Sequence, residues 1–348
     1  MAVDDTALYR KILSEAVKSI DGLELVTTAP RGSIALDKLR REPADLVLLD
    51  MFMPDMDGVE TLKAIKSEFP KCIVVMVSGA TTRDTSITVE ALRSGAADFI
   101  AKPKATSFEE GMKAMVESLR QAMKSLGFHS GNTHPPMFGD RSPVSDNIKH
   151  KKIPPPDHVD LVVIGVSTGG PQTLSKIIPK LPARLRAPVL IVQHMPPMFT
   201  ASLAEHLDRE CPLKVVEAAE SMPVEIGHVY IAPGGHHMLV ESISSKLKIR
   251  ISEDPPVNSC RPSADVLFES VAKLTNKSIL AVVLTGMGED GARGVAALKN
   301  KKCYCLSQSK ATCVVFGMPQ AIEKKQMADE VLDADKIADR ITDLVRQN

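Results

Sequence analysis

Short runs of consecutive apolar residues alternate along the chain with longer stretches in which apolar residues recur at helical spacing. Before residue 123, the apolar runs occupy residues 45–49, 72–77 and 97–100. After residue 156, they include residues 161–164, 189–192, 229–231, 247–251 and 279–284. Unbroken runs of Val, Ile and Leu are typical of strands buried on both faces, as in parallel sheets covered by helices. The pattern therefore predicts an α/β fold in both parts of the chain.

Residues 123–156 lack this alternation and hold six prolines and three glycines, ending in Pro154-Pro155-Pro156. This composition is typical of a flexible to semi-rigid linker. We therefore expect one domain over residues 1–122, a linker over residues 123–156 and a second domain over residues 157–348. Both domains fall within the usual size range.

The composition shows no bias toward one kind of partner. The 43 basic and 43 acidic residues give a formal net charge of zero, which argues against broad binding of nucleic acid or an anionic membrane. No apolar run approaches the roughly 20 residues of a membrane-spanning helix, and the first residues are acidic where a secretion signal is basic. The six cysteines show no zinc-site spacing. These features predict a reduced, cytoplasmic protein that is not inserted in a membrane and does not bind nucleic acid.

Charged and hydroxyl side chains follow the N-terminal apolar runs, at the strand ends where open α/β sheets carry their chemistry. They are Asp4 and Asp5 after Met-Ala-Val, Asp50, Ser78, and Lys102. Clustered carboxylates suit a hard cation such as Mg²⁺, and a lysine and a hydroxyl beside them suit a phosphoryl group. A carboxylate can itself accept the phosphoryl group. Taken singly, each acid is better explained as a loop residue or helix cap. Together and in this order, they favour a phosphate switch.

The segments VDDTALYRKIL, DLVLLDMFMPDMDGVETL, VSGAT and GAADFIAKP resemble the receiver domain of response regulators, over roughly residues 1–122. The resemblance implies a flavodoxin-like, five-stranded parallel sheet with helices on both faces. It also implies that Asp50 is the phosphoacceptor. The first 122 residues contain no histidine, so a separate kinase would have to supply the phosphoryl group.

The same resemblance assigns the supporting roles in this domain. Mg²⁺ would be held by Asp5, Asp50 and the carbonyl of Phe52, with Asp4 acting through water. The phosphoryl group would contact Ser78 and Lys102, and Phe99 would be the aromatic switch residue. One departure concerns the first strand, because only three residues precede Asp4 where a strand usually has about five or six. We therefore expect a short first strand, with short ladders to both of its neighbouring strands.

A possible nucleophile follows the first apolar run of the second part. Residues 161–164 lead into Gly165-Val166-Ser167-Thr168-Gly169, and a helical stretch follows. This strand, turn and helix fit the G-x-S-x-G pattern of a nucleophilic serine on a sharp turn, next to N–H groups that can stabilise an oxyanion. Taken alone, the turn fits a phosphate-binding loop or a purely structural turn as well. The dinucleotide-binding pattern G-x-G-x-x-G is absent.

A histidine and an aspartate follow two further apolar runs. His194 comes shortly after residues 189–192, and Asp290 lies in a glycine-rich segment after residues 279–284. Serine needs a base such as histidine, and an aspartate can orient that histidine. Singly, the first is better explained as a structural histidine and the second as an exposed Asp-Gly turn. The order Ser167, His194, Asp290 differs from the three common orders of such triads, which disfavours a standard α/β-hydrolase.

The segments IGVSTGGP, VQHMPPMFTASLAEHL, YIAPGGHHM, NSCRPSADVLFES and LTGMGEDGARG resemble the catalytic domain of the CheB family of chemotaxis methylesterases. The resemblance covers nearly all of residues 158–347 and implies a doubly wound, mostly parallel α/β domain. It implies Ser167 as nucleophile, His194 as general acid and base, and Asp290 as the residue that orients His194. Backbone N–H groups near Thr168 and Met287 would form the oxyanion hole.

The implied reactions are hydrolysis of glutamate γ-methyl esters on methyl-accepting chemotaxis receptors, with release of methanol, and deamidation of specific glutamines. Both are acyl transfers with different leaving groups, and the esterase step needs no metal. The implied partners are the receptors as substrates and a histidine kinase of the CheA type as phosphodonor. The resulting hypothesis is a methylesterase that phosphorylation of Asp50 activates. The alternative is a phospho-receiver signalling or binding module with a weak or vestigial esterase. A nucleotide-binding α/β protein is a third, disfavoured interpretation.

Three further motifs carry less weight. His236 and His237 lack an evident third metal ligand, so we interpret them as part of a loop that lines the substrate groove. Residues 261–263, Arg-Pro-Ser, fit a role in orienting the receiver or the substrate as well as a helix-capping role. Met195 and Met198 fit core packing better than an adaptable apolar surface.

Overall fold

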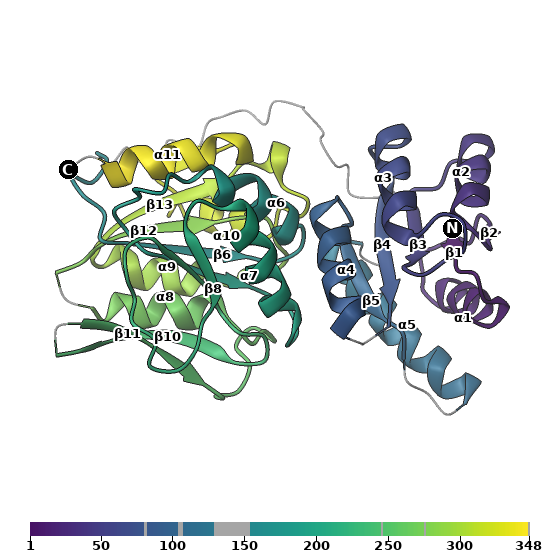
Figure 1. Ribbon diagram of the computed structural model, residues 1–348, viewed down its shortest axis with the longest axis horizontal. Helices are drawn as coiled ribbons and strands as arrows, with labels where there is room; N and C mark the ends of the chain where they lie inside the picture. Colours follow the sequence, from purple (N-terminus) through teal and green to yellow (C-terminus); the bar gives the residue numbers. More distant parts are fainter. Residues whose placement is uncertain (80–81, 104–106, 129–153, 245, 275, 347–348) are drawn as a thin grey trace. The chain divides into compact units, whose positions relative to one another are not determined.

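The computed structural model describes residues 1–79, 82–103, 107–128, 154–244, 246–274 and 276–346. The chain divides into two compact units, Met1–Phe138 and Gly139–Asn348 (Figure 1). Each unit is built around its own sheet. Within the described ranges, no helix combines the length and the apolar character that crossing a membrane requires.

The N-terminal unit contains a five-stranded, all-parallel sheet in the order β2-β1-β3-β4-β5, as predicted. The strands are β1 (Ala2–Val3), β2 (Thr28–Ala29), β3 (Leu46–Asp50), β4 (Ile73–Ser78) and β5 (Asp98–Ala101). The first strand is short, as expected, yet both of its residues pair with β2 and with β3. The terminal ammonium of Met1 extends this pairing by donating to the carbonyl of Leu46 at 2.8 Å.

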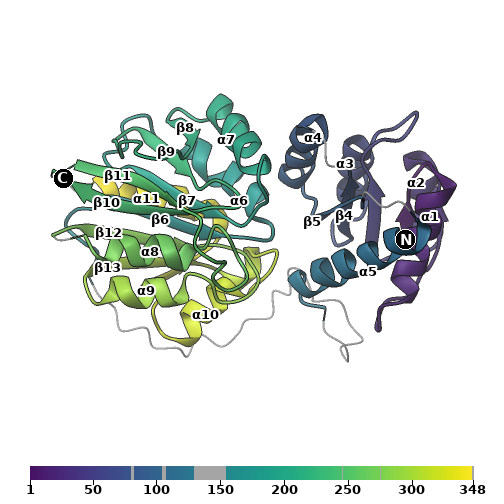
Figure 2. The same ribbon diagram turned by 90° about the horizontal axis from the view of Figure 1, so that it is seen from below.

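Helices cover both faces of this sheet. Helices α1 (Ala7–Lys18) and α5 (Phe108–Ser125) pack together on one face (Figure 2). Helices α2 (Gly32–Arg41), α3 (Gly58–Glu68) and α4 (Thr82–Arg93) form the other group. Helix α5 continues three residues into the segment that the sequence predicted as linker, and residues 129–153 of that segment lie outside the described residues.

The C-terminal unit contains a seven-stranded sheet in the order β14-β13-β12-β6-β7-β9-β8, in which every pair is parallel. The strands are β6 (Leu161–Val166), β7 (Val189–Gln193), β8 (Lys214–Glu217), β9 (His228–Ile231), β12 (Ser278–Val283), β13 (Lys302–Gln308) and β14 (Glu330–Leu332). Strands β6, β7 and β12 are buried along their whole length. Because β12, β6 and β7 are neighbours, the turns after them meet at one edge of the sheet.

Residues 247–251 differ from the sequence prediction. They lie in an antiparallel ribbon of β10 (His237–Ile243) and β11 (Lys246–Ser252), separate from the main sheet. Only Ile249 of this run is fully buried, because one face of the ribbon is turned to solvent. A one-sided ribbon with several apolar residues in sequence cannot be distinguished by pattern from a strand buried on both faces.

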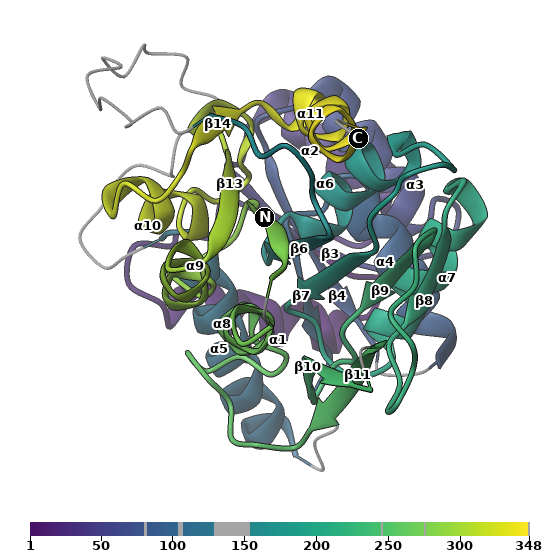
Figure 3. The same ribbon diagram turned by 90° about the vertical axis from the view of Figure 1, so that its left-hand side faces the viewer.

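Two groups of helices enclose the seven-stranded sheet (Figure 3). One group holds α6 (Gly170–Ile177), α7 (Phe199–Glu210) and α11 (Ala334–Arg346), with the 3-10 turn η1 (Ile178–Lys180). The other holds α8 (Ala264–Ala272), α9 (Ala292–Lys299) and α10 (Met318–Lys324), preceded by the 3-10 turn η2 (Lys310–Thr312). The main core lies between the sheet and α8 and α9, where Phe268 and Tyr230 are almost fully buried. This doubly wound arrangement is the predicted one.

Candidate active site and phosphorylation site

The first candidate site lies at the carboxyl edge of the N-terminal sheet. Asp4 directly follows β1, Asp50 is the last residue of β3, and Lys102 directly follows β5. Nζ of Lys102 lies 2.7 Å from Oδ1 of Asp50 and 2.9 Å from Oδ2 of Asp4. The same Nζ lies over the ring of Tyr9, 4.6 Å from its centroid. The structure thus brings together three charged residues that the sequence placed only at strand ends.

The acidic residues of this site fit a divalent cation. Carboxylate oxygens of Asp4, Asp5 and Asp50 lie within 4.8 Å of one another. Oδ2 of Asp4 is buried and has no hydrogen bond of good geometry from the described residues, although Lys102 lies beside it. A set of carboxylate oxygen ligands suits Mg²⁺. Phe52 follows in the adjoining loop, with 42% of the residue exposed.

The charge state of Asp50 reflects its surroundings. Burial raises the pKa of Asp50 to about 6, and the hydrogen bond from Lys102 opposes this rise. The nearby charge of Asp4 raises the pKa further, and the N–H of Met51, which donates to Oδ1 at 2.8 Å, lowers it. A cation held between the acids would favour their ionised forms.

Ser78 is the last residue of β4, which is next to β3, and Phe99 lies on β5, on the far side of β4. The hydroxyl of Ser78 donates to the carbonyl of Gly79 at 3.2 Å and accepts from the hydroxyl of Thr88 in α4 at 2.9 Å. Phe99 is half-buried on β5, where it pairs with Met76. Their roles in phosphoryl contact and switching stay predictions.

The second candidate site lies at the carboxyl edge of the C-terminal sheet, where Ser167 follows β6. The N–H of Ser167 donates to the carbonyl of Thr285 at 3.0 Å. Its carbonyl accepts from the N–H of Gly170 at 2.7 Å and from Nε2 of Gln193 at 3.0 Å. Gly169 supports this sharp turn with a φ of 76°, which favours glycine. A Cβ at Gly286 would lie only 2.7 Å from Cβ of Ser167, so glycine is needed there for close approach.

His194 occupies the equivalent position on the next strand. Val166 of β6 pairs with Gln193 of β7, so Ser167 and His194 leave the two strands side by side. The amide of Gln193 donates to the carbonyls of both residues, at 3.0 Å to Ser167 and 3.2 Å to His194. No hydrogen bond joins the Ser167 hydroxyl to His194 in the part of the chain that the structure describes; such bonds often form only when substrate binds.

Asp290 reaches His194 from the segment after β12. Nε2 of His194 lies 2.7 Å from Oδ2 of Asp290, and Nδ1 lies 3.5 Å from Sγ of Cys260. Burial alone would lower the pKa of His194, but hydrogen bonds to Asp290 and Cys260 raise it to about 9. Burial alone would raise the pKa of Asp290, but hydrogen bonds from His194, Ser263 and the N–H of Ala264 hold it well below its ordinary value. The pair therefore favours the imidazolium and carboxylate forms.

The oxyanion hole at the N–H groups of Thr168 and Met287 stays a prediction. Both residues are half-buried in the turns after β6 and β12, and neither N–H donates to any acceptor among the described residues. The hydroxyl of Thr285 donates to the carbonyl of Thr168 at 3.0 Å and so ties the two turns together. Two free N–H groups on connected turns can bind one developing oxyanion.

Sequence reasoning missed the segment that surrounds Asp290. Asn258 and Ser263 both donate to Oδ1 of Asp290, at 3.0 Å and 2.7 Å, and Cys260 contacts His194. A serine directly before a helical run signals a helix cap, and that signal marked Ser263 without identifying its partner. The segment NSCRPSADVLFES, which begins with Asn258, carried part of the family resemblance, but the sequence assigned no role to Asn258 or Cys260, because the residues they contact are distant in sequence.

Two of the weaker motifs need correction, and the contacts of a third can be described. His237 is fully buried and contacts the backbone at Pro255 and Ser263, so it does not line a groove. Met195 is buried as predicted, but Met198 is 48% exposed and so does not pack in the core. Arg261 donates to the carbonyls of Glu253 and Asp254, which anchors its own loop.

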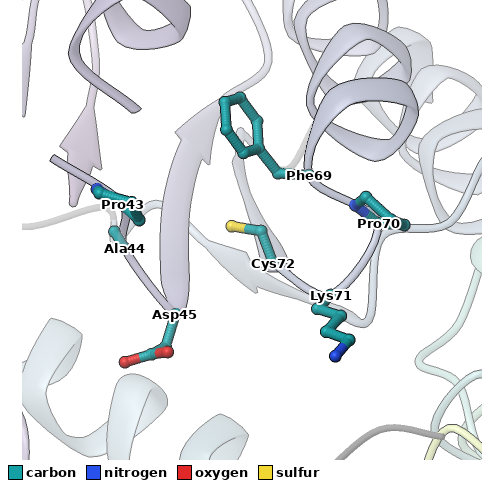
Figure 4. A pocket seen from close by; sticks show the side chains of 7 residues that line it. All are labelled: Pro43, Ala44, Asp45, Phe69, Pro70, Lys71 and Cys72. Carbon is teal, nitrogen blue, oxygen red and sulfur yellow. The ribbon is translucent and has the colours of Figure 1, made fainter. Parts of the chain in front are cut away.

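A pocket of about 330 Å³ lies at the opposite edge of the N-terminal sheet from Asp50 (Figure 4). It is lined by Pro43, Ala44, Asp45, Phe69, Pro70, Lys71 and Cys72. Burial raises the pKa of the Cys72 thiol to about 11, which keeps it protonated at neutral pH. None of the predicted site residues lines this pocket.

The two folds and their strand-end residues define a class of protein: a response regulator whose second unit is a doubly wound α/β hydrolase. Comparison with known proteins identifies the family. The CheB methylesterase family matches residues 162–341, and the response regulator receiver domain family matches residues 1–117. The chain belongs to the CheB family of protein-glutamate methylesterases/protein-glutamine glutaminases.

Relatives over the full length support this assignment. A protein-glutamate methylesterase/protein-glutamine glutaminase of Desulfotalea psychrophila is 39% identical over 360 residues, covering 99% of this chain and 98% of the relative. The corresponding protein of Salmonella typhimurium is 38% identical, covering 98% of this chain and 95% of the relative. The crystal structure of the Thermotoga maritima CheB methylesterase catalytic domain superposes with a TM-score of 0.53 at 42% identity, covering 54% of this chain and 99% of that one.

Proposed function

We propose that this chain hydrolyses glutamate γ-methyl esters, and deamidates specific glutamines, on methyl-accepting chemotaxis receptors, using Ser167, His194 and Asp290. We further propose that phosphorylation of Asp50 by a histidine kinase of the CheA type activates the esterase. The resulting change in receptor methylation gives sensory adaptation. The observation that carries the proposal is the 2.7 Å pair of His194 and Asp290 beside the turn that holds Ser167. The action on receptor segments inside the cell places the chain in the cytoplasm.

The geometry indicates which nitrogen of His194 acts as the base. Because Nε2 is bound to Asp290, Nδ1 is the nitrogen that takes the proton of the Ser167 hydroxyl. The serine oxygen attacks the ester carbonyl, and the N–H groups of Thr168 and Met287 donate hydrogen bonds to the resulting oxyanion. The intermediate collapses as His194 returns the proton to the leaving methoxide, so that methanol departs and an acyl-serine remains.

Hydrolysis of the acyl-serine completes the cycle. His194 takes a proton from water, whose oxygen attacks the acyl carbonyl, and then returns that proton to Ser167. The products are free glutamate carboxylate and the original serine. For a glutamine side chain, ammonia leaves in place of methanol, and the other bonds that form and break are the same. Asp290 stabilises the imidazolium in both halves of the reaction.

In this proposal, the N-terminal unit regulates the esterase activity. The Asp50 carboxylate attacks the phosphorus of the phosphohistidine on the kinase, the bond between phosphorus and the histidine nitrogen breaks, and the histidine leaves while Asp50 becomes an acyl phosphate. Mg²⁺ would be held by Asp5, Asp50 and the carbonyl of Phe52, with Asp4 acting through water, and would neutralise charge on the phosphoryl oxygens. Lys102 and Ser78 then contact that group, and Phe99 responds as the switch residue. Lys102 already holds the carboxylates of Asp4 and Asp50 together.

The test is methanol release from methylated receptor membranes. We expect Ser167→Ala to lower the rate by roughly 10⁶-fold, to the limit of detection, because the nucleophile is lost. Ser175→Ala is the matched control, because that hydroxyl donates to the carbonyl of Pro171 within helix α6. It should release methanol at the wild-type rate. Equal release by Ser167→Ala and wild type would overturn the catalytic proposal and favour a binding module with a vestigial esterase.

A further inference from the structure

The carboxylate of Asp290 caps a helix that belongs to a different segment of the chain. Its oxygens accept from the N–H groups of Ala264 at 2.6 Å and Asp265 at 3.2 Å, which are the first two of helix α8. These N–H groups have no partner inside the helix, and the positive end of the helix dipole favours a carboxylate there. Helix α8 therefore holds the residue that we propose to orient His194.

Ser263 is the N-cap of this helix, yet its hydroxyl does not cap it. An N-cap serine normally accepts a hydrogen bond from the second or third N–H of its helix, and Ser263 accepts none. Its hydroxyl instead donates to Oδ1 of Asp290 at 2.7 Å, in a position with no exposure to solvent. The Ser263 hydroxyl therefore does not cap its own helix. It donates instead to the carboxylate beside His194.

His237 fixes the backbone of Ser263. The N–H of Ser263 donates to Nδ1 of His237 at 3.2 Å, so this nitrogen carries no proton. Nε2 must then carry the proton, and it faces the carbonyl of Pro255 at 3.2 Å. The buried His237 is thus neutral in this arrangement.

Asn258 provides a second donor to the same oxygen. Its Nδ2 donates to Oδ1 of Asp290 at 3.0 Å and to Oδ2 of Asp265 at 2.9 Å. Asn258 has a φ of 52°, a conformation that asparagine adopts more readily than most residues. With Oδ1 occupied in this way, Oδ2 is the oxygen presented to His194.

We propose that Ser263 and Asn258 are positioning residues of the methylesterase, which fix the Asp290 carboxylate so that Oδ2 faces His194. This inference rests on the proposed function of the triad. Neither residue touches the reacting atoms, so each acts through Asp290. A carboxylate that has lost one of these donors keeps its bonds from the N–H groups of Ala264 and Asp265 but is held less firmly, so the orientation of the His194 ring is less well fixed.

The same donors limit how strongly Asp290 attracts a proton on His194. Without one of them, more of the carboxylate charge is available to His194, and the pKa of His194 should rise above its value of about 9 in the intact site. The other charged or titratable groups that face this pair are Cys260 beside His194, Asp265 and Arg293. These groups are unchanged in the variants proposed below.

The experiment compares two buried serines at the start and the end of helix α8. Ser263→Ala should lower kcat about 10- to 100-fold, the scale of one hydrogen bond to a charged group, with KM unchanged. It should also move the rising limb of the pH–rate profile to higher pH. Ser270→Ala is the control, because that hydroxyl bonds Val240 and Leu267 and makes no contact with the triad. It should lower stability and leave kcat and the profile unchanged.

If Ser263→Ala does not fold, a second pair of variants tests whether these donors position Asp290. Asn258→Gly should show the same loss of kcat and the same shift, whereas Ser259→Gly, at the neighbouring position with a φ of 61°, should behave as wild type. A wild-type profile in Ser263→Ala or in Asn258→Gly would overturn the inference, as would the same shift in either control. A wild-type chain that releases no methanol would instead overturn the proposed function.

Discussion

The two ring nitrogens of His194 have different surroundings, and this difference governs the chemistry at the residue scale. Nε2 is bound to a buried carboxylate, and Nδ1 faces the thiol of Cys260. An imidazole in this position can act as a base only after it loses a proton. Its pKa therefore sets the pH range of catalysis.

We expect kcat/KM for methyl ester hydrolysis to rise with pH up to about 9. Hydrogen bonds to Asp290 and Cys260 outweigh burial and raise the pKa of His194 to about 9, so the neutral base becomes more abundant as pH rises toward that value. Asp290→Asn should move the rising limb of the pH–rate profile to lower pH, toward the ordinary histidine pKa of about 6.5. It should also lower kcat by roughly 10⁴-fold. A pH–rate series on both proteins measures the effect. A wild-type limb near pH 6.5 would show that the pair does not control the base.

At the scale of elements, strand order determines which turns form the site. The sequence predicted that Ser167, His194 and Asp290 follow buried strands, and the neighbouring positions of β12, β6 and β7 then bring those strand ends together. Asp4 and Asp50 likewise lie at the ends of the neighbouring strands β1 and β3, and Lys102 reaches them from the end of β5, on the far side of β4. Periodicity identifies strands but not their order, and it could not show that residues 247–251 belong to a separate ribbon.

The contacts of Asn258, Cys260 and Ser263 could not be predicted for a related reason. These residues lie in an irregular segment, and Asp290 and His194, which they contact, are 27 or more residues away in sequence. Local patterns determine a cap or a turn but not which distant side chain completes it. The family resemblance implied the roles of the triad residues. Only the structure showed which other residues contact the triad.

The start of helix α6 lies directly against the residue that joins the two catalytic turns. A Cβ at Gly170 would lie 1.8 Å from Oε1 of Gln193, whose amide donates to the carbonyls of Ser167 and His194. Gly170→Ala should therefore displace both turns and lower kcat by about 10²-fold, the scale for misplacing reacting groups by about 1 Å.

Gly227→Ala serves as the comparison for this variant in the methanol assay. Its φ of 84° strains an alanine, but a Cβ there meets no atom within 4 Å, so it should lower stability without changing kcat. A wild-type kcat in Gly170→Ala would show that the Gln193 bridge does not position the two turns.

At the scale of the whole molecule, a receiver domain and a methylesterase domain occur in one chain as two separate compact units. Phosphorylation of Asp50 would add negative charge among the carboxylates that surround it. Lys102 and a cation must then neutralise this charge. Coupling between the units is the central claim of the proposed function, since either unit could act without the other.

The most direct test measures methanol release by wild type and by Asp50→Asn, each with and without Mg²⁺ and a small-molecule phosphodonor. Asp50→Asn keeps nearly the same side-chain shape and leaves the C-terminal unit untouched, so both proteins should share one basal rate. The account predicts that the donor raises the rate of wild type and has no effect on Asp50→Asn. Equal stimulation of both proteins, or no stimulation of wild type, would contradict it.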